Sequence, residues 1–118
     1  MNQTPEPEIF NVDDLLRRMM GDRDLATEII AEFIDDLFNQ ISGLEKSVSL
    51  GATDMIVRQI HTIKGASGNV GAKRLERLAR EAEKAGVAHD SDQANAFISD
   101  LLHQAGLLKD ELKNNGFL

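Results

Sequence analysis

Cysteine, tryptophan and tyrosine are absent from the 118-residue chain, and proline occurs only twice. Without cysteine there is neither a disulfide framework nor a thiolate metal site, a composition that suits the reducing cytoplasm. The five phenylalanines are the only aromatic residues, too few for the stacking platform of a protein that binds single-stranded nucleic acid. The N-terminus lacks the basic start and apolar run of a signal peptide, and no apolar stretch approaches the length of a membrane span. We therefore expect a cytoplasmic protein.

The charge balance is acidic, with 13 lysines and arginines against 20 aspartates and glutamates and a net charge of -7. Proteins that bind the nucleic-acid backbone or an anionic membrane surface need an excess of positive charge. We therefore expect neither nucleic acid nor a membrane among the partners of this chain.

Apolar residues recur at steps of three, four and five along most of the chain, which is the period of an α-helix and not of a strand. The expected helices cover residues 12–20, the stretch between Asp22 and Gly51, residues 52–68, residues 72–85, and the stretch after Asp90. Four long amphipathic helices with short links form an antiparallel bundle most economically. The sequence thus predicts an all-α fold over residues 11–118, an antiparallel four-helix bundle with a short additional N-terminal helix. A flexible lead-in is expected over residues 1–10 because its first eight residues are polar and acidic and include both prolines.

The most informative segment covers residues 61–72 and reads HTIKGASGNVGA. On a helix with about 100° per residue, one line of residues faces the core: Ile56, Ile60, Ile63 and Ser67. His61 points well away from this line, Gly65 and Gly68 fall on the face of His61, and Lys64 falls beside them. Each glycine costs a helix about 1 kcal/mol relative to alanine, so we interpret the pair as clearance above the imidazole.

A nucleophilic ring nitrogen, a mobile cation and a bare platform are a reasonable minimum for phosphoryl transfer when a partner supplies the metal and most of the electrostatics. Lys64 can neutralise phosphate oxygens as a point charge, although a solvated surface lysine would look the same in the sequence. Gly65 could instead permit close helix packing, and Gly71 is better explained by turn geometry than by phosphate contact.

This segment resembles the signature of histidine-containing phosphotransfer (HPt) domains, His-x-(Leu/Ile)-Lys-Gly followed by Gly-Ala a few residues later. The resemblance extends to the order of the helices, a short leading helix and four bundle helices with the histidine on the second of these. It implies that His61 is the phosphoacceptor, Lys64 the phosphate-side cation, Gly65 the clearance residue and Gly71 a turn residue. It also implies that the partner is a receiver domain, in a response regulator or a hybrid sensor histidine kinase, whose aspartate exchanges the phosphoryl group.

We therefore predict a monomeric histidine phosphotransfer protein of a two-component phosphorelay, with no cofactor or metal of its own and magnesium on the partner receiver only. It is not expected to be an enzyme, because the sequence shows no nucleotide-binding segment of a kinase. The Glu-x-x-His pairs of helical di-metal proteins are also absent. The alternative is a non-catalytic helical adaptor that binds a partner without chemistry.

The face of this chain on which the partner docks is predicted from apolar residues that the bundle core does not require. The short first helix offers Leu16 and Met19, and Val57 lies one turn before His61 but off the core line. Charged neighbours such as Arg58 are expected to tune specificity. The alternative for Met19 is that it only seals the end of the bundle.

Overall fold

The computed structural model describes residues 5–118, in which helices follow one another and no strand occurs. The elements are α1 (Val12–Arg18), α2 (Arg23–Ser49), α3 (Thr53–Asn69), α4 (Lys73–Ala85), the short 3-10 helix η1 (Val87–His89) and α5 (Ser91–Asn114). The predicted all-α class is confirmed. Within residues 5–118, no helix combines the length and the apolar content that a bilayer span requires.

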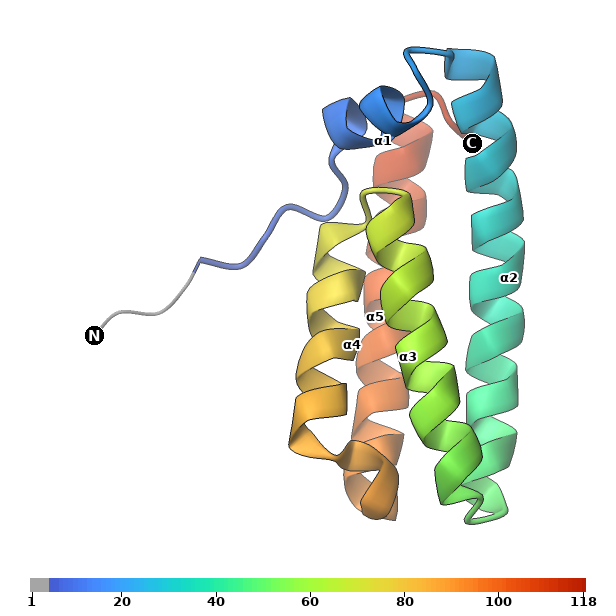
Figure 1. The fold of residues 1–118 in the computed structure, drawn as a ribbon, viewed down its shortest axis with the longest axis vertical. Helices are drawn as coiled ribbons and strands as arrows, with labels where there is room; N and C mark the ends of the chain where they lie inside the picture. The colour runs from blue at the N-terminus through green and yellow to red at the C-terminus, as the bar shows by residue number, and fades with distance from the viewer. Residues whose placement is uncertain (1–4) are drawn as a thin grey trace.

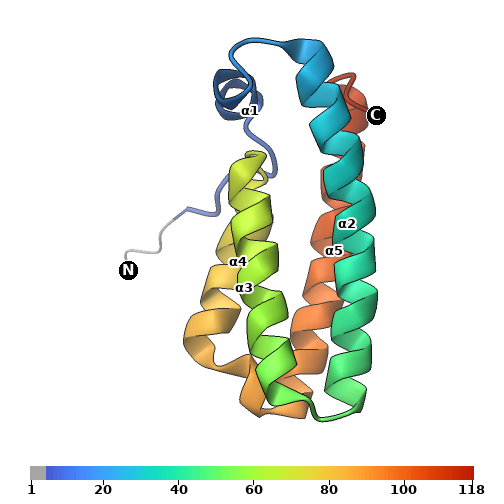
Figure 2. The same ribbon diagram turned by 45° about the vertical axis from the view of Figure 1, so that its right-hand side comes forward.

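The four long helices lie side by side along one axis, and α1 crosses one end of them (Figure 1). Helix α2 packs against α3 and α5, and α4 packs against the same two neighbours, so the four helices close a ring around a shared core. Figure 2 shows α1 above the end where α3 stops and α4 starts. The predicted antiparallel four-helix bundle with a short additional helix is confirmed.

Three of the helices begin after an N-cap residue whose side chain accepts a hydrogen bond from the first turn. Asn11, Asp22 and Asp90 each accept from the backbone N–H three residues later, as expected of N-cap residues. Helix α1 ends earlier than residue 20, because Met20 adopts a left-handed conformation with φ 55° and leads into Gly21. The 3-10 helix η1, which the periodicity did not predict, fills the link between α4 and α5.

The predicted boundary between a flexible lead-in over residues 1–10 and the bundle domain is wrong for Phe10. Phe10 is buried in the core, and its ring meets Phe117 edge-on with centroids 5.7 Å apart. Ahead of it, Arg74 and Arg77 donate hydrogen bonds to backbone carbonyls at residues 7 and 5, each at 3.0 Å. The bundle domain therefore includes Phe10, and residues 1–4 of the expected lead-in lie outside the described residues.

Gly71 occupies the α3–α4 turn, as predicted, and joins that turn to α1. Its φ of 77° is left-handed, and a Cβ added there would lie 2.7 Å from the backbone oxygen of Asn11. In return, the N–H of Asn11 donates to the carbonyl of Gly71 at 2.9 Å. Both the conformation and the close approach require glycine at this position.

The buried carboxylate of Asp14 is a second link between α1 and α4. Its oxygens lie 2.9 Å from Lys73 Nζ, 2.7 Å from Arg17 Nη2 and 3.3 Å from Arg18 Nε. The hydrogen bond from Lys73, followed by that from Arg17, holds the pKa of Asp14 well below its usual range. Asp14 therefore stays ionised when the protein is folded and fixes α1 against the start of α4.

Replacing Asp14 by asparagine is expected to lower the free energy of unfolding by about 1 to 3 kcal/mol at neutral pH, because charge-assisted hydrogen bonds are lost. A depressed folded-state pKa contributes stability that is present above the ordinary aspartate pKa and is lost as the pH falls below about 4. Urea unfolding of both proteins between pH 7 and pH 2.5 should show the difference shrinking. Asp13→Asn, on the exposed side of the same turn, is the control. A stability difference that does not change with pH would contradict the ion-pair account.

Candidate functional site

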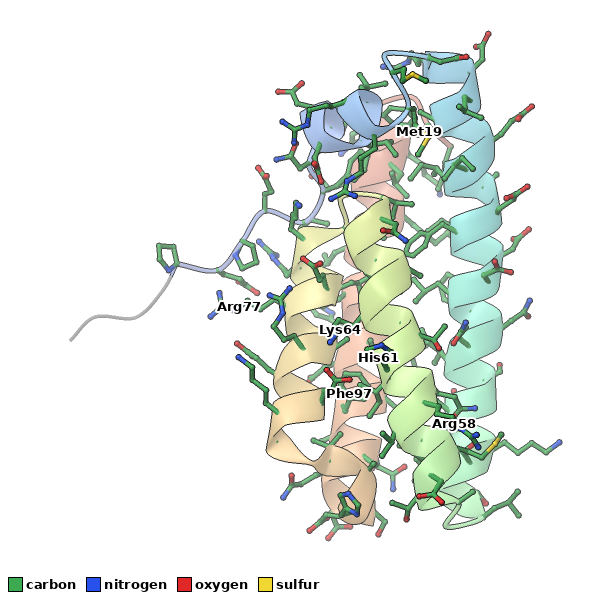
Figure 3. The ribbon with its side chains drawn as sticks, viewed as in Figure 1. Met19, Arg58, His61, Lys64, Arg77 and Phe97 are labelled. Carbon is green, nitrogen blue, oxygen red and sulfur yellow. The ribbon has the colours of Figure 1, made fainter. Side chains whose placement is uncertain are left out.

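His61 projects from α3 into solvent, with its side chain 68% exposed. The residues of the predicted core line are buried on another side of the same helix: Ile56, Ile60, Ile63 and Ser67. Helix periodicity therefore placed the imidazole correctly outside the core. Figure 3 shows His61 and Lys64 on the side of α3 that is turned toward α4.

The carboxylate of Glu83, on α4, contacts both of these side chains. Its Oε2 lies 2.9 Å from Nδ1 of His61, and its Oε1 lies 2.6 Å from Nζ of Lys64. Lys64 follows His61 by three residues and so lies on the same side of α3. A single carboxylate thus holds the histidine and the lysine, one with each oxygen.

The charges in this group determine which nitrogen of His61 is free. Hydrogen bonding from Lys64, and then from His61, lowers the pKa of Glu83, so the carboxylate is ionised at neutral pH. An ionised carboxylate can only accept hydrogen bonds, so the hydrogen of a neutral His61 ring belongs on Nδ1. The lone pair of Nε2 is then left for an incoming electrophile. The arrangement prepares one defined atom of the ring as a nucleophile.

Sequence reasoning missed Glu83, which follows His61 by 22 residues on another helix. The signal that could have found it is the short turn at Gly71, which makes α3 and α4 an antiparallel pair. His61 lies ten residues before Gly71 and Glu83 twelve residues after it, so the two face each other across the pair. Spacing along one helix cannot reveal such a partner.

The structure separates the two glycines that were predicted to give access. Gly65 is exposed, and a Cβ added there would meet no atom of the described residues within 4 Å beyond its own helix backbone and chain neighbours. Gly68 is buried, and an added Cβ would collide with the carboxylate of Glu76 on α4. The access role predicted for Gly68 is therefore wrong, because α4 covers that direction near the end of α3. Gly68 makes room for the Glu76 side chain of α4, whereas Gly65 leaves open surface beside His61.

The residues predicted to form a docking face lie in two places. Leu16 and Met19 belong to α1 and its C-cap, and Val57 and Arg58 precede His61 on α3. Leu16 and Met19 are only partly exposed because they pack against the core at the α1 end, where Figure 3 labels Met19. Val57 is 40% exposed at the other end, where it borders a hollow of about 150 Å³ that also touches Glu83. Arg58 is exposed beside it.

Within residues 5–118, no group of three or more His, Asp or Glu side chains is arranged to hold a metal ion.

Comparisons with known proteins identify the family and the fold. A family model described as the Hpt domain matches residues 28–114, which is well over half of the 118 residues. Among solved structures, the chain is similar to the HPt domain of an Hpt sensor hybrid histidine kinase from Shewanella, with a TM-score of 0.69 and 21% sequence identity. That likeness covers 90% of this chain and 95% of the other and shows a shared fold. No curated protein matches the chain.

Removing the Glu83 carboxylate should change the tautomer of His61. In Glu83→Ala, the fraction of His61 that carries its hydrogen on Nδ1 is expected to fall about threefold or more, because that hydrogen loses its acceptor. Long-range nitrogen–proton NMR at about pH 8.5, where histidine is ordinarily neutral, reports both ring nitrogens. Glu81→Ala is the matched control, since Glu81 pairs with Arg77 elsewhere on α4. An identical tautomer ratio in wild type and Glu83→Ala would remove the assigned hydrogen bond.

Proposed function

Because this chain belongs to the Hpt domain family, and is thus a phosphotransfer module of two-component systems, we propose that it serves a phosphorelay. His61 would carry the phosphoryl group and exchange it with the aspartate of a receiver domain. One observation supports this proposal above all. The exposed His61 ring has its Nδ1 bound by Glu83, which leaves Nε2 to react. A receiver in a response regulator or a hybrid sensor histidine kinase is the proposed partner.

In the proposed transfer, Nε2 of His61 attacks the phosphorus of the receiver's acyl phosphate in line. A nitrogen–phosphorus bond forms as the phosphorus–oxygen bond breaks, and the aspartate carboxylate leaves with the electron pair. The ring gains positive charge because its hydrogen stays on Nδ1, and the Glu83 carboxylate stabilises that charge. The reverse transfer follows the same path, with magnesium held by the receiver and with no kinase activity on this chain.

The surface around His61 suits a reaction between two proteins. Gly65 leaves open space one turn after the histidine, where a partner's backbone can approach. Lys64 keeps its ammonium beside the ring through Glu83 and is available to the phosphate oxygens. A non-catalytic adaptor would have no use for a carboxylate that fixes the hydrogen of an exposed histidine.

His61→Gln is expected to abolish uptake of a phosphoryl group and to leave the fold intact, because the side chain is exposed and off the core line. The chain would be incubated with a phosphorylated receiver domain, and acid-labile phosphate on the chain would be followed. His103→Gln, which changes an exposed histidine on α5, should label like wild type. Labelling of His61→Gln at the wild-type rate would refute the proposal.

The docking face is proposed to extend from His61 toward Val57, because a protein interface of ordinary size covers about 800 Å² on each partner and so reaches at least one helical turn from its centre. Val57→Asp places a charge in that face and is expected to weaken receiver binding about tenfold. Leu102→Asp is a matched control, because Leu102 is 44% exposed, close to the 40% of Val57, but lies on α5. Titration calorimetry with the receiver would measure both, and equal weakening by both variants would argue against this docking face.

A further inference from the structure

The charges beside His61 leave the proposed phosphohistidine under-neutralised. Lys64 is already paired with Glu83, so these two side chains together carry no net charge. A phosphoryl group adds a charge of about -1.5 to -2 at neutral pH. Between transfers, when no receiver supplies magnesium, that charge has to be met by this chain's own cations. The following inference rests on the proposed function and concerns which cation does this.

The register of α3 and α4 places Arg80 opposite Lys64. Glu83 lies beside His61, and Glu76 lies beside Gly68. Gly68 follows His61 by seven residues on α3, and Glu76 precedes Glu83 by seven residues on α4. Arg80 precedes Glu83 by three residues, just as Lys64 follows His61 by three residues. Because the helices are antiparallel, both positions lie about one turn from the histidine in the same direction.

Arg80 is held loosely where it stands. Its Nη2 lies 3.5 Å from Oε2 of Glu76, and its side chain is 47% exposed. Ion pairs this exposed contribute little, typically below about 1 kcal/mol. Lys64, by contrast, is mostly buried and lies 2.6 Å from Glu83. Arg80 can therefore leave Glu76 at little cost, whereas moving Lys64 would disturb the carboxylate that holds His61.

Gly65 is an exposed position with open space around it, one turn after His61 and on the Arg80 side by the register of the two helices. A Cβ added at Gly65 would meet no described atom within 4 Å beyond its own helix backbone and chain neighbours, so packing does not require glycine there. The lack of a side chain at Gly68 lets the Glu76 carboxylate lie against α3, and Glu76 in turn keeps the Arg80 guanidinium near that side of α4. Gly65 thus leaves open space beside the ring, and Gly68 leaves room for the carboxylate that holds Arg80.

We propose that Arg80 is a second phosphate-binding cation, which leaves Glu76, extends over Gly65 and binds the phosphoryl oxygens on Nε2 of His61. A guanidinium suits this contact because its planar fork donates two parallel hydrogen bonds to a phosphate. Other charged side chains near this face include Lys64, Glu83 and Glu76, described above, Lys84, which follows Glu83, and Arg58, which lies three residues before His61 on α3. Arg80 lies one turn before Glu83 on α4, and its ion-pair partner among the described residues is the weakly bound Glu76.

Arg77 provides a matched control on the same helix. It lies about 100° around α4 from Glu76, whereas Arg80 lies about 40° from it. Its Nε contacts Glu81 at 2.9 Å, and its Nη1 donates to the backbone oxygen of Pro5. Removing Arg77 changes the net charge as Arg80→Ala does, but it leaves the Arg80 guanidinium in place.

The test uses phosphoramidate as donor, whose nitrogen–phosphorus bond breaks as the bond to Nε2 forms and ammonia leaves with the electron pair. Phosphorus NMR then follows the phosphoryl group of phospho-His61 as the pH is varied. A nearby cation lowers the pKa of a phosphoryl group, so Arg80→Ala is expected to raise it by about 0.5 to 1 unit relative to wild type. Arg77→Ala should leave it within about 0.2 unit, and Arg80→Lys, which keeps the charge, within about 0.3 unit.

Two results would overturn the role of Arg80. One is a phosphoryl pKa in Arg80→Ala equal to that of wild type, and the other is a rise of the same size in Arg77→Ala or in Arg80→Lys. Thermal unfolding of each variant shows that the comparison is made on folded protein. Failure of the wild-type chain to form phosphohistidine would instead refute the proposed function, so the two failures are distinguishable.

Discussion

Two carboxylates of α4 meet α3 two helical turns apart, Glu76 beside Gly68 and Glu83 against His61. The antiparallel register of these helices therefore decides the chemistry of the exposed face. Were α4 shifted by one turn, the Nδ1 hydrogen of His61 would lose its acceptor and Lys64 its partner. The buried side chains of α3 and α4 fix that register, so the packing of the core selects the ring nitrogen that faces solvent.

The same turn that sets this register also carries α1. The carbonyl of Gly71 accepts a hydrogen bond from the N–H of Asn11, and a side chain at Gly71 would collide with the Asn11 backbone. Asp14 binds Lys73 at the start of α4. Helix α1 is thus fixed to the helix pair that bears His61, although it is too short to be stable alone. A partner that covers both α1 and the histidine would meet one rigid surface.

Much of the fold could be predicted from the sequence because helices and their caps are local. The apolar period, the cap residues and the glycine turns predicted the bundle. The angular positions of the residues around α3 predicted that His61 lies outside the core. Apart from the end of α1 and the short helix η1, the failures were tertiary. Gly68 lies on the predicted face but under α4, and Phe10 belongs to the core through Phe117 at the far end of the chain. Glu83 reaches His61 only through helix pairing, which periodicity along one helix does not describe.

The central claim is that Glu83 reserves Nδ1 of His61 and leaves Nε2 as the atom that takes the phosphoryl group. Phosphorus–nitrogen coupling in NMR spectra of the phosphorylated, nitrogen-labelled chain identifies the bonded atom directly. The account predicts a coupling to Nε2 of His61 and none to Nδ1. Phosphorus bonded to Nδ1, or to any other residue, would contradict it.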